Sequence, residues 1–200
     1  MSSISVAGDS SGSITIAAPA VAGSGTLTLP VIAADTLAGI AATQTLTNKS
    51  IAATQLTGTI AAAALPAGSV LQVVNATYST STTNSTASYA DTGLTATITP
   101  TRNTSKILVI VSQNGVSGTS ATTGVNLQLL RGASSISIFG VANAYGAANN
   151  NITVSCNYLD SPATTSATTY KTQFVRYAGT TVNVQSNSDM STITLMEIAG

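Results

Sequence analysis

The sequence predicts an all-β protein in which short β segments and a thin shaft precede an antiparallel, jelly-roll-like β-sandwich. Two observations predict this fold class. The phrase IAATQ begins at Ile40 and again at Ile51 within an Ala/Thr-rich stretch, a pattern typical of a repetitive shaft. After Gly68, alternating apolar and polar residues form about nine short runs separated by turn residues, as in sandwiches and jelly rolls. The predicted domains are residues 1–35, residues 36–68 and residues 69–200.

The first domain contains two short alternating segments, one around Ile14 and Ile16 and one around Leu27 and Leu29. Turn residues separate them, so each is predicted to be a strand. A unit of two strands is marginally stable by itself. We therefore expect this domain to need other copies of the chain or another protein as a partner.

The repeat of residues 40–64 is too poor in large apolar side chains to fold alone. It contains no residue larger than Leu, Gln or Lys and a single charge, Lys49. Such a segment cannot bury enough apolar surface to offset the conformational entropy lost on folding. It is either an Ala/Thr-rich linker without fixed structure or a shaft that identical chains complete by wrapping together. No heptad is sustained, which argues against a coiled coil.

Composition limits the partners that the chain can have. Charged residues make up 6% of the chain and its net charge is zero, with the basic residues scattered. Because phosphate binding needs clustered Lys and Arg, no nucleic-acid interface is expected. No apolar run reaches the roughly 18 to 20 residues of a membrane span, and the start resembles no secretory signal. We therefore expect neither membrane insertion nor export.

No catalytic residue, cofactor or metal site is predicted. The chain has no His, which removes Ser-His-Asp and Cys-His catalysis and the commonest transition-metal ligand. Cys156, the only cysteine, occupies an inward position of an alternating strand, so a buried structural thiol is expected. Asp91 and Asp160 are each interpreted first as turn residues. Two carboxylates could still pair in space as in a polysaccharide-cleaving glycosidase, so a depolymerase stays an alternative.

Two groups of residues are candidates for binding. The run from Ile107 to Val111 is continuously apolar and predicts a strand buried on both faces, by another sheet or by a neighbouring subunit. Tyr and Asn on loops suit sugar recognition, although each Tyr could instead cap the core. The candidate core residues of a trimer are Ile107, Leu108, Val109, Ile110 and Val111, and the candidate glycan-binding residues are Tyr145, Asn149, Tyr89 and Tyr177.

Residues 12–30, GSITIAAPAVAGSGTLTLP, resemble the recurrent Gly-x-Ile/Val-Thr-Leu-x-Ala-Pro…Ala-Gly…Thr-Leu-Thr-Leu-Pro unit of tailed-bacteriophage tail fibres and related virion proteins. Residues 43–51, TQTLTNKSI, resemble a phrase that often follows this unit. Phrases after Val70, such as SKILVIVS and STITLMEIA, resemble the C-terminal β-sandwich of phage fibre and decoration proteins. The resemblance implies a homotrimeric structural protein of the virion, assembled in the host cytoplasm.

The same resemblance implies that residues 1–35 bind capsid, tail or baseplate proteins and that the sandwich is an outward knob. Two positions on the particle stay open at this point. The chain is either a short tail or side fibre whose knob binds host-surface glycan, or a capsid decoration protein, cement protein or head fibre. A bacterial surface adhesin is a further alternative, but it would require export.

Overall fold

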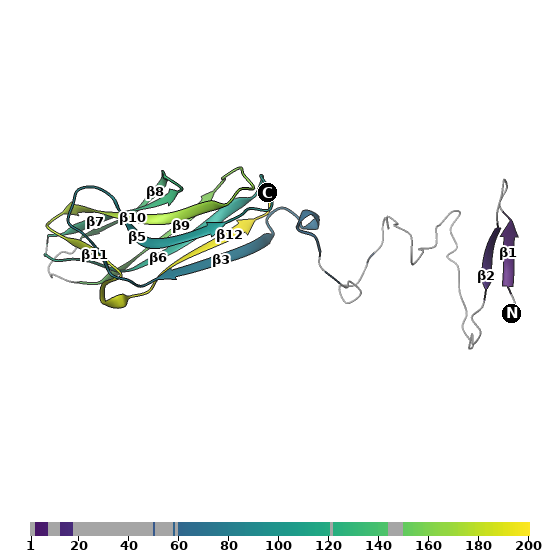
Figure 1. Cartoon of the computed structure of the whole chain (residues 1–200), viewed down its shortest axis with the longest axis horizontal. Helices are drawn as coiled ribbons and strands as arrows, with labels where there is room; N and C mark the ends of the chain where they lie inside the picture. Colours follow the sequence, from purple (N-terminus) through teal and green to yellow (C-terminus); the bar gives the residue numbers. More distant parts are fainter. Residues whose placement is uncertain are drawn as a thin grey trace. The chain divides into compact units, whose positions relative to one another are not determined.

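The computed structural model of the chain describes residues 3–7, 13–17, 50, 58, 60–120, 122–143 and 150–200. The chain divides into two compact units, Met1–Thr57 and Gly58–Gly200. In the first unit, β1 (Ser3–Ala7) and β2 (Ser13–Ala17) form an antiparallel ladder (Figure 1). The strand predicted around Ile14 and Ile16 is β2, whereas the one predicted around Leu27 and Leu29 lies outside the described residues.

The second unit is a β-sandwich of two antiparallel sheets, as predicted (Figure 1). The four-stranded sheet has the order β5 (Ala90–Ile98), β10 (Thr168–Ala178), β7 (Gly124–Arg131) and β8 (Ser134–Asn143). The six-stranded sheet has the order β3 (Val70–Tyr78), β12 (Ser191–Ile198), β6 (Lys106–Gly118), β11 (Val182–Val184) and β4 (Thr82–Asn84), with β9 (Ile152–Asp160) on the free edge of β6. The described residues include no helix with the length and apolar character of a membrane span.

The long strand β6 organises the six-stranded sheet. It pairs with β12 along one edge and with β9 along the other, and its last residues pair with β11. Between β11 and β12, the backbone N–H of Gln185 donates to the carbonyl of Asn114 at 3.0 Å, so both strands follow the same edge of β6. Because β4 pairs with β11 and β3 pairs with β12, the sheet has four strand positions across its width: β3/β4, β11/β12, β6 and β9.

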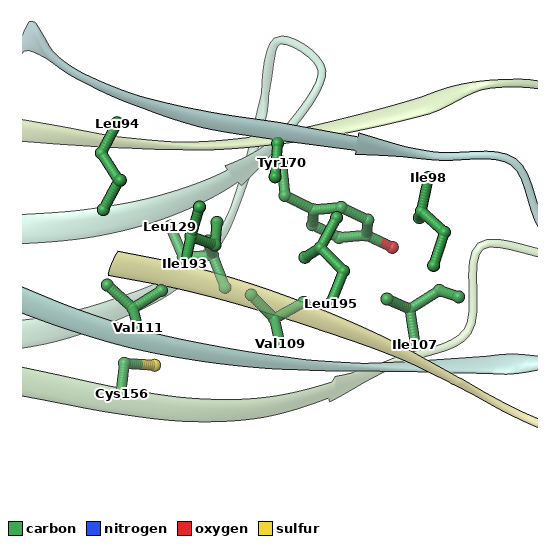
Figure 2. Close-up of a cluster of buried hydrophobic side chains, with 11 residues drawn as sticks. Leu94, Ile98, Ile107, Val109, Val111, Leu129, Cys156, Tyr170, Ile193 and Leu195 are labelled. Atoms are coloured by element: carbon green, nitrogen blue, oxygen red, sulfur yellow. The ribbon is translucent and has the colours of Figure 1, made fainter. Parts of the chain in front are cut away.

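The apolar core between the sheets consists of two clusters. The larger contains Leu94, Ala96, Ile98, Ile107, Val109, Val111, Leu129, Cys156, Tyr170, Ile193 and Leu195 (Figure 2). The smaller contains Val116, Val125, Leu127, Phe174, Val182 and Val184. The predicted burial of Cys156 is confirmed, and Val125, Leu127 and Leu129 of β7 are buried with it. Burial raises the pKa of the Cys156 thiol, so that thiol is a poor nucleophile.

A layer of buried polar side chains lies between the two clusters. The side chains of Thr92 and Thr172 come from one sheet, and those of Gln113, Gln185 and Ser191 come from the other. Thr172 lies on β10 between Tyr170 of the larger cluster and Phe174 of the smaller one. Thr92, Thr172, Gln113, Gln185 and Ser191 are here called the polar layer. They join the two sheets through hydrogen bonds among their side chains.

Hydrogen bonds run through the polar layer from sheet to sheet. The hydroxyls of Thr92 and Thr172 lie 2.6 Å apart, and Thr172 donates to Oε1 of Gln113 at 3.0 Å. The amides of Gln113 and Gln185 donate to the Ser191 hydroxyl at 3.0 and 3.1 Å. Buried polar groups cost free energy unless they are paired. The layer therefore disfavours any shift of one sheet over the other that would break these pairs.

Residues 61–68, here called the junction segment, are bonded to one end of the sandwich. They include the short helix η2 (Ala62–Ala64), whose Ala62 carbonyl accepts from the guanidinium of Arg102. The same guanidinium donates to the carbonyl of Leu65 at 3.3 Å, and Gly68 donates to the carbonyl of Ala199 at 2.8 Å. Apart from Ser50, Gly58 and Ile60, the rest of the predicted shaft lies outside the described residues.

Candidate functional site

Strand β6 contains the run predicted to be buried on both faces. Ile107, Val109 and Val111 are fully buried against the four-stranded sheet, as Figure 2 shows for their side chains. Leu108 is partly buried and Ile110 is 38% exposed, and both lie on the outer face of the six-stranded sheet. Within a single chain the run is therefore covered on one face, and burial of the other face requires a second molecule.

An apolar row crosses that outer face from edge to edge. Met196 of β12 pairs with Val73 on one side and with Leu108 on the other, and Leu108 pairs with Leu159 of β9. Val73 is 56% exposed and Leu159 is 52% exposed, while the two central side chains are partly buried. We call Val73, Met196, Leu108 and Leu159 the apolar row. It is a continuous hydrophobic strip exposed to solvent in the single chain.

The Tyr candidates occupy one end of the four-stranded sheet. Ala90 of β5 pairs with Phe174 of β10, which places Tyr89 and Tyr177 on neighbouring strands near the same sheet end. Tyr89 is 37% exposed and Tyr177 is 66% exposed, so both rings can be reached from solvent. The other two glycan-binding candidates, Tyr145 and Asn149, lie outside the described residues.

A polar cavity of about 280 Å³ lies beside β11 and the short helix η3 (Ser186–Ser188). Its lining is made only of hydroxyl and amide side chains, which come from Ser81, Ser117, Asn151, Asn183, Ser186 and Asn187. The Ser117 and Ser186 hydroxyls lie 2.9 Å apart, and Asn183 accepts from Thr83 at 3.0 Å. These contacts hold the lining in place, and the cavity offers uncharged donors and acceptors to a ligand.

The backbone at this cavity is unusual. Gln185, Asn187 and Ser188 have φ angles of 52°, 57° and 62°, in the left-handed region that residues other than Gly rarely adopt. Three such residues close together store local strain, which recurs at binding and switch sites. Sequence reasoning missed this cavity, and the only signal for it was the run of Asn and Ser after Val184.

The three buried or paired carboxylates of the sandwich have separate structural partners. Asp160 accepts from Nη1 of Arg131 at 2.9 Å and from the Tyr170 hydroxyl at 2.7 Å. It is buried at the end of β9, so the expectation of a plain turn residue was incomplete. Burial raises the pKa of Tyr170, and the neighbouring Asp160 carboxylate raises this pKa further.

Glu197 is fully buried, with no cation as its partner. Its carboxylate accepts from Gln72 at 2.6 Å, from the backbone and hydroxyl of Thr101 at 2.7 and 2.8 Å, and from Ser105 at 2.6 Å. Burial alone would raise the pKa of Glu197, but the hydrogen bonds from Ser105, Gln72 and Thr101 outweigh it and hold the pKa below its ordinary value. This carboxylate therefore anchors the turn before β6 to β12.

Asp91 lies inside β5 and corrects the prediction of a turn. It accepts from Lys171 at 3.0 Å and from Gln173 at 2.7 Å on the neighbouring strand. Burial would raise the pKa of Asp91, but the hydrogen bonds from Lys171 and Gln173 and the Lys171 charge lower it.

The carboxylates of Asp91, Asp160 and Glu197 have no hydrogen-bond partner in common, and each is engaged by its own donors. The described part of the chain also holds no group of three or more His, Cys, Asp or Glu that could bind a metal ion.

Comparisons with known protein families and with curated proteins find no match to this chain. The inference of function therefore rests on the chain itself: on the phrases in its sequence, its sandwich, its apolar row and its polar cavity.

Proposed function

We propose that the chain is a structural protein of a tailed-phage virion. It forms a homotrimeric short fibre or spike that is anchored through residues 1–35 and carries the β-sandwich as an outward knob. The observation that carries the proposal is the order of features along one chain. Phrases similar to those of phage fibres, at residues 12–30 and 43–51, precede a complete β-sandwich that starts at Val70.

The topology of the sandwich supports this proposal. Four strand positions in the order β3, β12, β6 and β9 face four in the order β5, β10, β7 and β8. After β4, every connection except β7 to β8 and β11 to β12 crosses from one sheet to the other. This is a jelly-roll arrangement, which recurs in viral capsid proteins and in lectins. A fold alone does not assign a function, so the topology adds to the phrases of the N-terminal region and does not replace them.

The junction segment supports the role of the sandwich as a knob on a stalk. Arg102 holds the carbonyls of Ala62 and Leu65, and Gly68 is bonded to Ala199. The chain therefore enters the sandwich at a fixed place beside the start of β3 and the end of β12. A connection ordered in this way orients a knob better than a free linker does.

The experiment that tests this proposal locates the protein on the particle. Antibodies raised against the full chain are applied to purified virions, which are then imaged by electron microscopy. A matched variant lacks residues 1–57 and keeps the junction segment, because residues 61–68 belong to the sandwich unit. We expect label on wild-type particles and none on particles assembled with the truncated protein. Virions that lack the full-length protein would refute the proposal.

The polar cavity supports one form of this function, in which the sandwich binds host-surface glycan. Amide and hydroxyl groups match the hydroxyls of sugars, and two solvent-accessible Tyr rings belong to the same sandwich. Full-length protein is tested on immobilised cell-surface polysaccharide of the host, with Asn183→Ala as the cavity variant and Asn103→Ala, an exposed residue of another turn, as the control. Loss of glycan binding in Asn183→Ala, with binding kept in Asn103→Ala, supports the cavity as the glycan-binding site. If the wild type binds isolated capsids and no glycan, the chain is a decoration protein.

We further propose that the knob has no hydrolytic activity, since its carboxylates are engaged with separate partners. The test is a clearing assay on host polysaccharide, followed by chromatography of the products. Shortened chains in the wild-type sample would establish a depolymerase instead.

A further inference from the structure

We infer that copies of the chain pack against one another through the outer face of the six-stranded sheet, with the apolar row at the centre of the contact. This inference rests on the proposed homotrimer and identifies the surface that holds it together. The occupant of the face is therefore a second copy of this chain.

The apolar row is not required by the fold of a single chain. The next row of the same face is Asn75, Thr194, Ile110 and Asn157, and the row after it is Thr77, Thr192, Ser112 and Ser155. These rows show that the sheet accepts polar side chains at outward positions. The fold of the sandwich therefore does not require apolar side chains at all four strand positions of the apolar row.

Further apolar side chains widen the row. Ile110 lies in the adjacent row with 38% exposure, and Val70 pairs with Ile198 on the other side with 47% of its surface exposed. Ile110, Val70, Ile198 and the four residues of the apolar row together form one patch near the start of β3 and the end of β12. Burial of a patch of this kind is favourable by roughly 25 cal/mol for each Å² of apolar surface removed from water.

The opposite face of the sandwich has different chemistry. On the four-stranded sheet, Gln128 donates to Gln173 at 2.8 Å, Gln173 donates to Asp91 at 2.7 Å, and Lys171 forms an ion pair with Asp91. Charged and amide groups that are already satisfied there suit contact with water. The two outer faces therefore differ, and the face that carries the apolar row is the one to be covered.

The charge distribution favours a second copy as the occupant. In a symmetric assembly, residues near the axis meet their own copies, so any charge there would face a like charge. None of the three outward rows described above contains a charged residue, and the nearest charge, Lys106, pairs with Ile198 at the margin of the patch. Apart from Lys106 at its margin, the patch has no charged residue, so its centre can contact a second copy without repulsion between like charges.

The position of the patch relative to the junction segment points to the same occupant. Val70 begins β3 directly after the junction segment, and Gly68 is bonded to Ala199 next to Ile198. Copies joined through residues before Gly58 would keep these sandwich ends close together. The effective concentration is then high, so a small apolar contact is sufficient to hold the sandwiches in one arrangement.

Cross-linking of the full chain tests the inference. Thr194→Cys places a thiol in the centre of the outer face, and Thr97→Cys places one on the outer face of the four-stranded sheet as a matched control. Native Cys156 is buried, so the unsubstituted protein is the blank. With a short bismaleimide, we expect covalent multimers from Thr194→Cys and only single chains from Thr97→Cys.

A second set of variants tests the apolar row. Val73→Lys and Leu159→Lys are combined with Thr194→Cys, and both sites are more than half exposed, so the single chain should still fold. Ile138→Lys, at a 65% exposed position of the other sheet, is the charge control. We expect the double change, and not Ile138→Lys, to reduce cross-linking to the level of Thr97→Cys, while circular dichroism and the melting temperature show that each variant is folded.

Light scattering of the wild type separates the possible outcomes. A mass of three times 19.8 kDa, combined with equal cross-linking at positions 194 and 97, overturns this inference and leaves the homotrimer standing. A mass of a single 19.8 kDa chain overturns both the inference and the homotrimer.

Discussion

The Tyr170 hydroxyl donates a hydrogen bond to the Asp160 carboxylate at 2.7 Å, inside the larger apolar cluster. The same carboxylate is held by both of its oxygens to Arg131. The pair thus joins β10 of one sheet to the end of β9 in the other. Removal of the hydroxyl leaves a buried acceptor without one of its donors.

Tyr170→Phe should lower the free energy of unfolding by about 1.5–3 kcal/mol, the usual range for a hydrogen bond to a charged group. Urea denaturation at neutral pH measures this change. The control is Tyr177→Phe, at a residue that is 66% exposed, which should leave stability unchanged. Equal stability of Tyr170→Phe and wild type would show that the bond contributes nothing net.

Glu197 should make the sandwich sensitive to acid. Its folded-state pKa lies below the ordinary value of 4.5, so its stabilising contribution is present above pH 4.5 and is lost as the pH falls through the folded-state pKa. The difference in unfolding free energy between wild type and Glu197→Gln should be largest at neutral pH and should shrink below pH 4.5.

Urea denaturation at a series of pH values checks this dependence. The control is Asp189→Asn, which changes an exposed acid. A difference between wild type and Glu197→Gln that stays constant from neutral pH to well below pH 4.5 would contradict the role assigned to this carboxylate.

The polar layer should be sensitive to the loss of a single hydroxyl. Thr172→Val keeps the shape of the side chain but leaves Oε1 of Gln113 and the Thr92 hydroxyl without this partner. We expect a loss of about 1–3 kcal/mol in unfolding free energy, the cost of leaving buried polar groups unpaired. Thr169→Val, three residues earlier on the outward side of β10, should have a smaller effect. A double-mutant cycle with Thr92→Val should show coupling between the two threonines, and strict additivity would argue against a connected layer.

Gly115 and Gly132 form a natural comparison. Both have positive φ angles, 61° and 59°, so Ala at either position carries the same backbone strain. A Cβ at Gly115 would overlap the backbone of Ser186, whereas a Cβ at Gly132 meets open space. Gly115→Ala should therefore be more destabilising than Gly132→Ala by roughly 1–3 kcal/mol, the usual cost of overpacking. Equal melting temperatures for the two variants would show that the backbone between β11 and β12 moves enough to accommodate the added Cβ.

Arg102→Ala should release the junction segment without unfolding the sandwich. The guanidinium donates to Ala62 and Leu65, and Arg102 is a member of neither apolar cluster. Hydrogen exchange of the amides of Ala64 and Leu65 should become faster, while exchange in β6 stays unchanged. Lys106→Ala, which changes an exposed cation on the same end of β6, is the control.

The alternation of residues allowed most of the sandwich to be predicted. Leu127 and Leu129 on β7 and Cys156 on β9 are inward as expected, because strict alternation leaves little choice of face. The same reasoning failed where polar residues point inward. Asp91 was expected in a turn, but it lies in β5 beside the buried Thr92, and Gly93 adopts a φ of 87° within the strand.

The polar layer and the cavity could not be predicted from the sequence. A Gln at an inward position, such as Gln113 or Gln185, cannot be told from a loop residue until its partners on other strands are known. The cavity needs four separate chain segments to meet, which local patterns do not reveal. The run from Ile107 to Val111 was predicted to be buried on both faces, whereas in the structure one face is buried and Ile110 on the other face is 38% exposed.

The junction segment and the end of β12 lie side by side, since Gly68 is bonded to Ala199. Strand β3 starts there and stays bonded to β12 over its whole length. A tensile load applied at Gly68 and taken up at the opposite end of the sandwich would pull parallel to these strands, so their hydrogen bonds would resist shear together. The same force applied between residues 68 and 199 would unzip them one after another, so the sandwich should be mechanically strong along its length and weak across the end that holds these two residues.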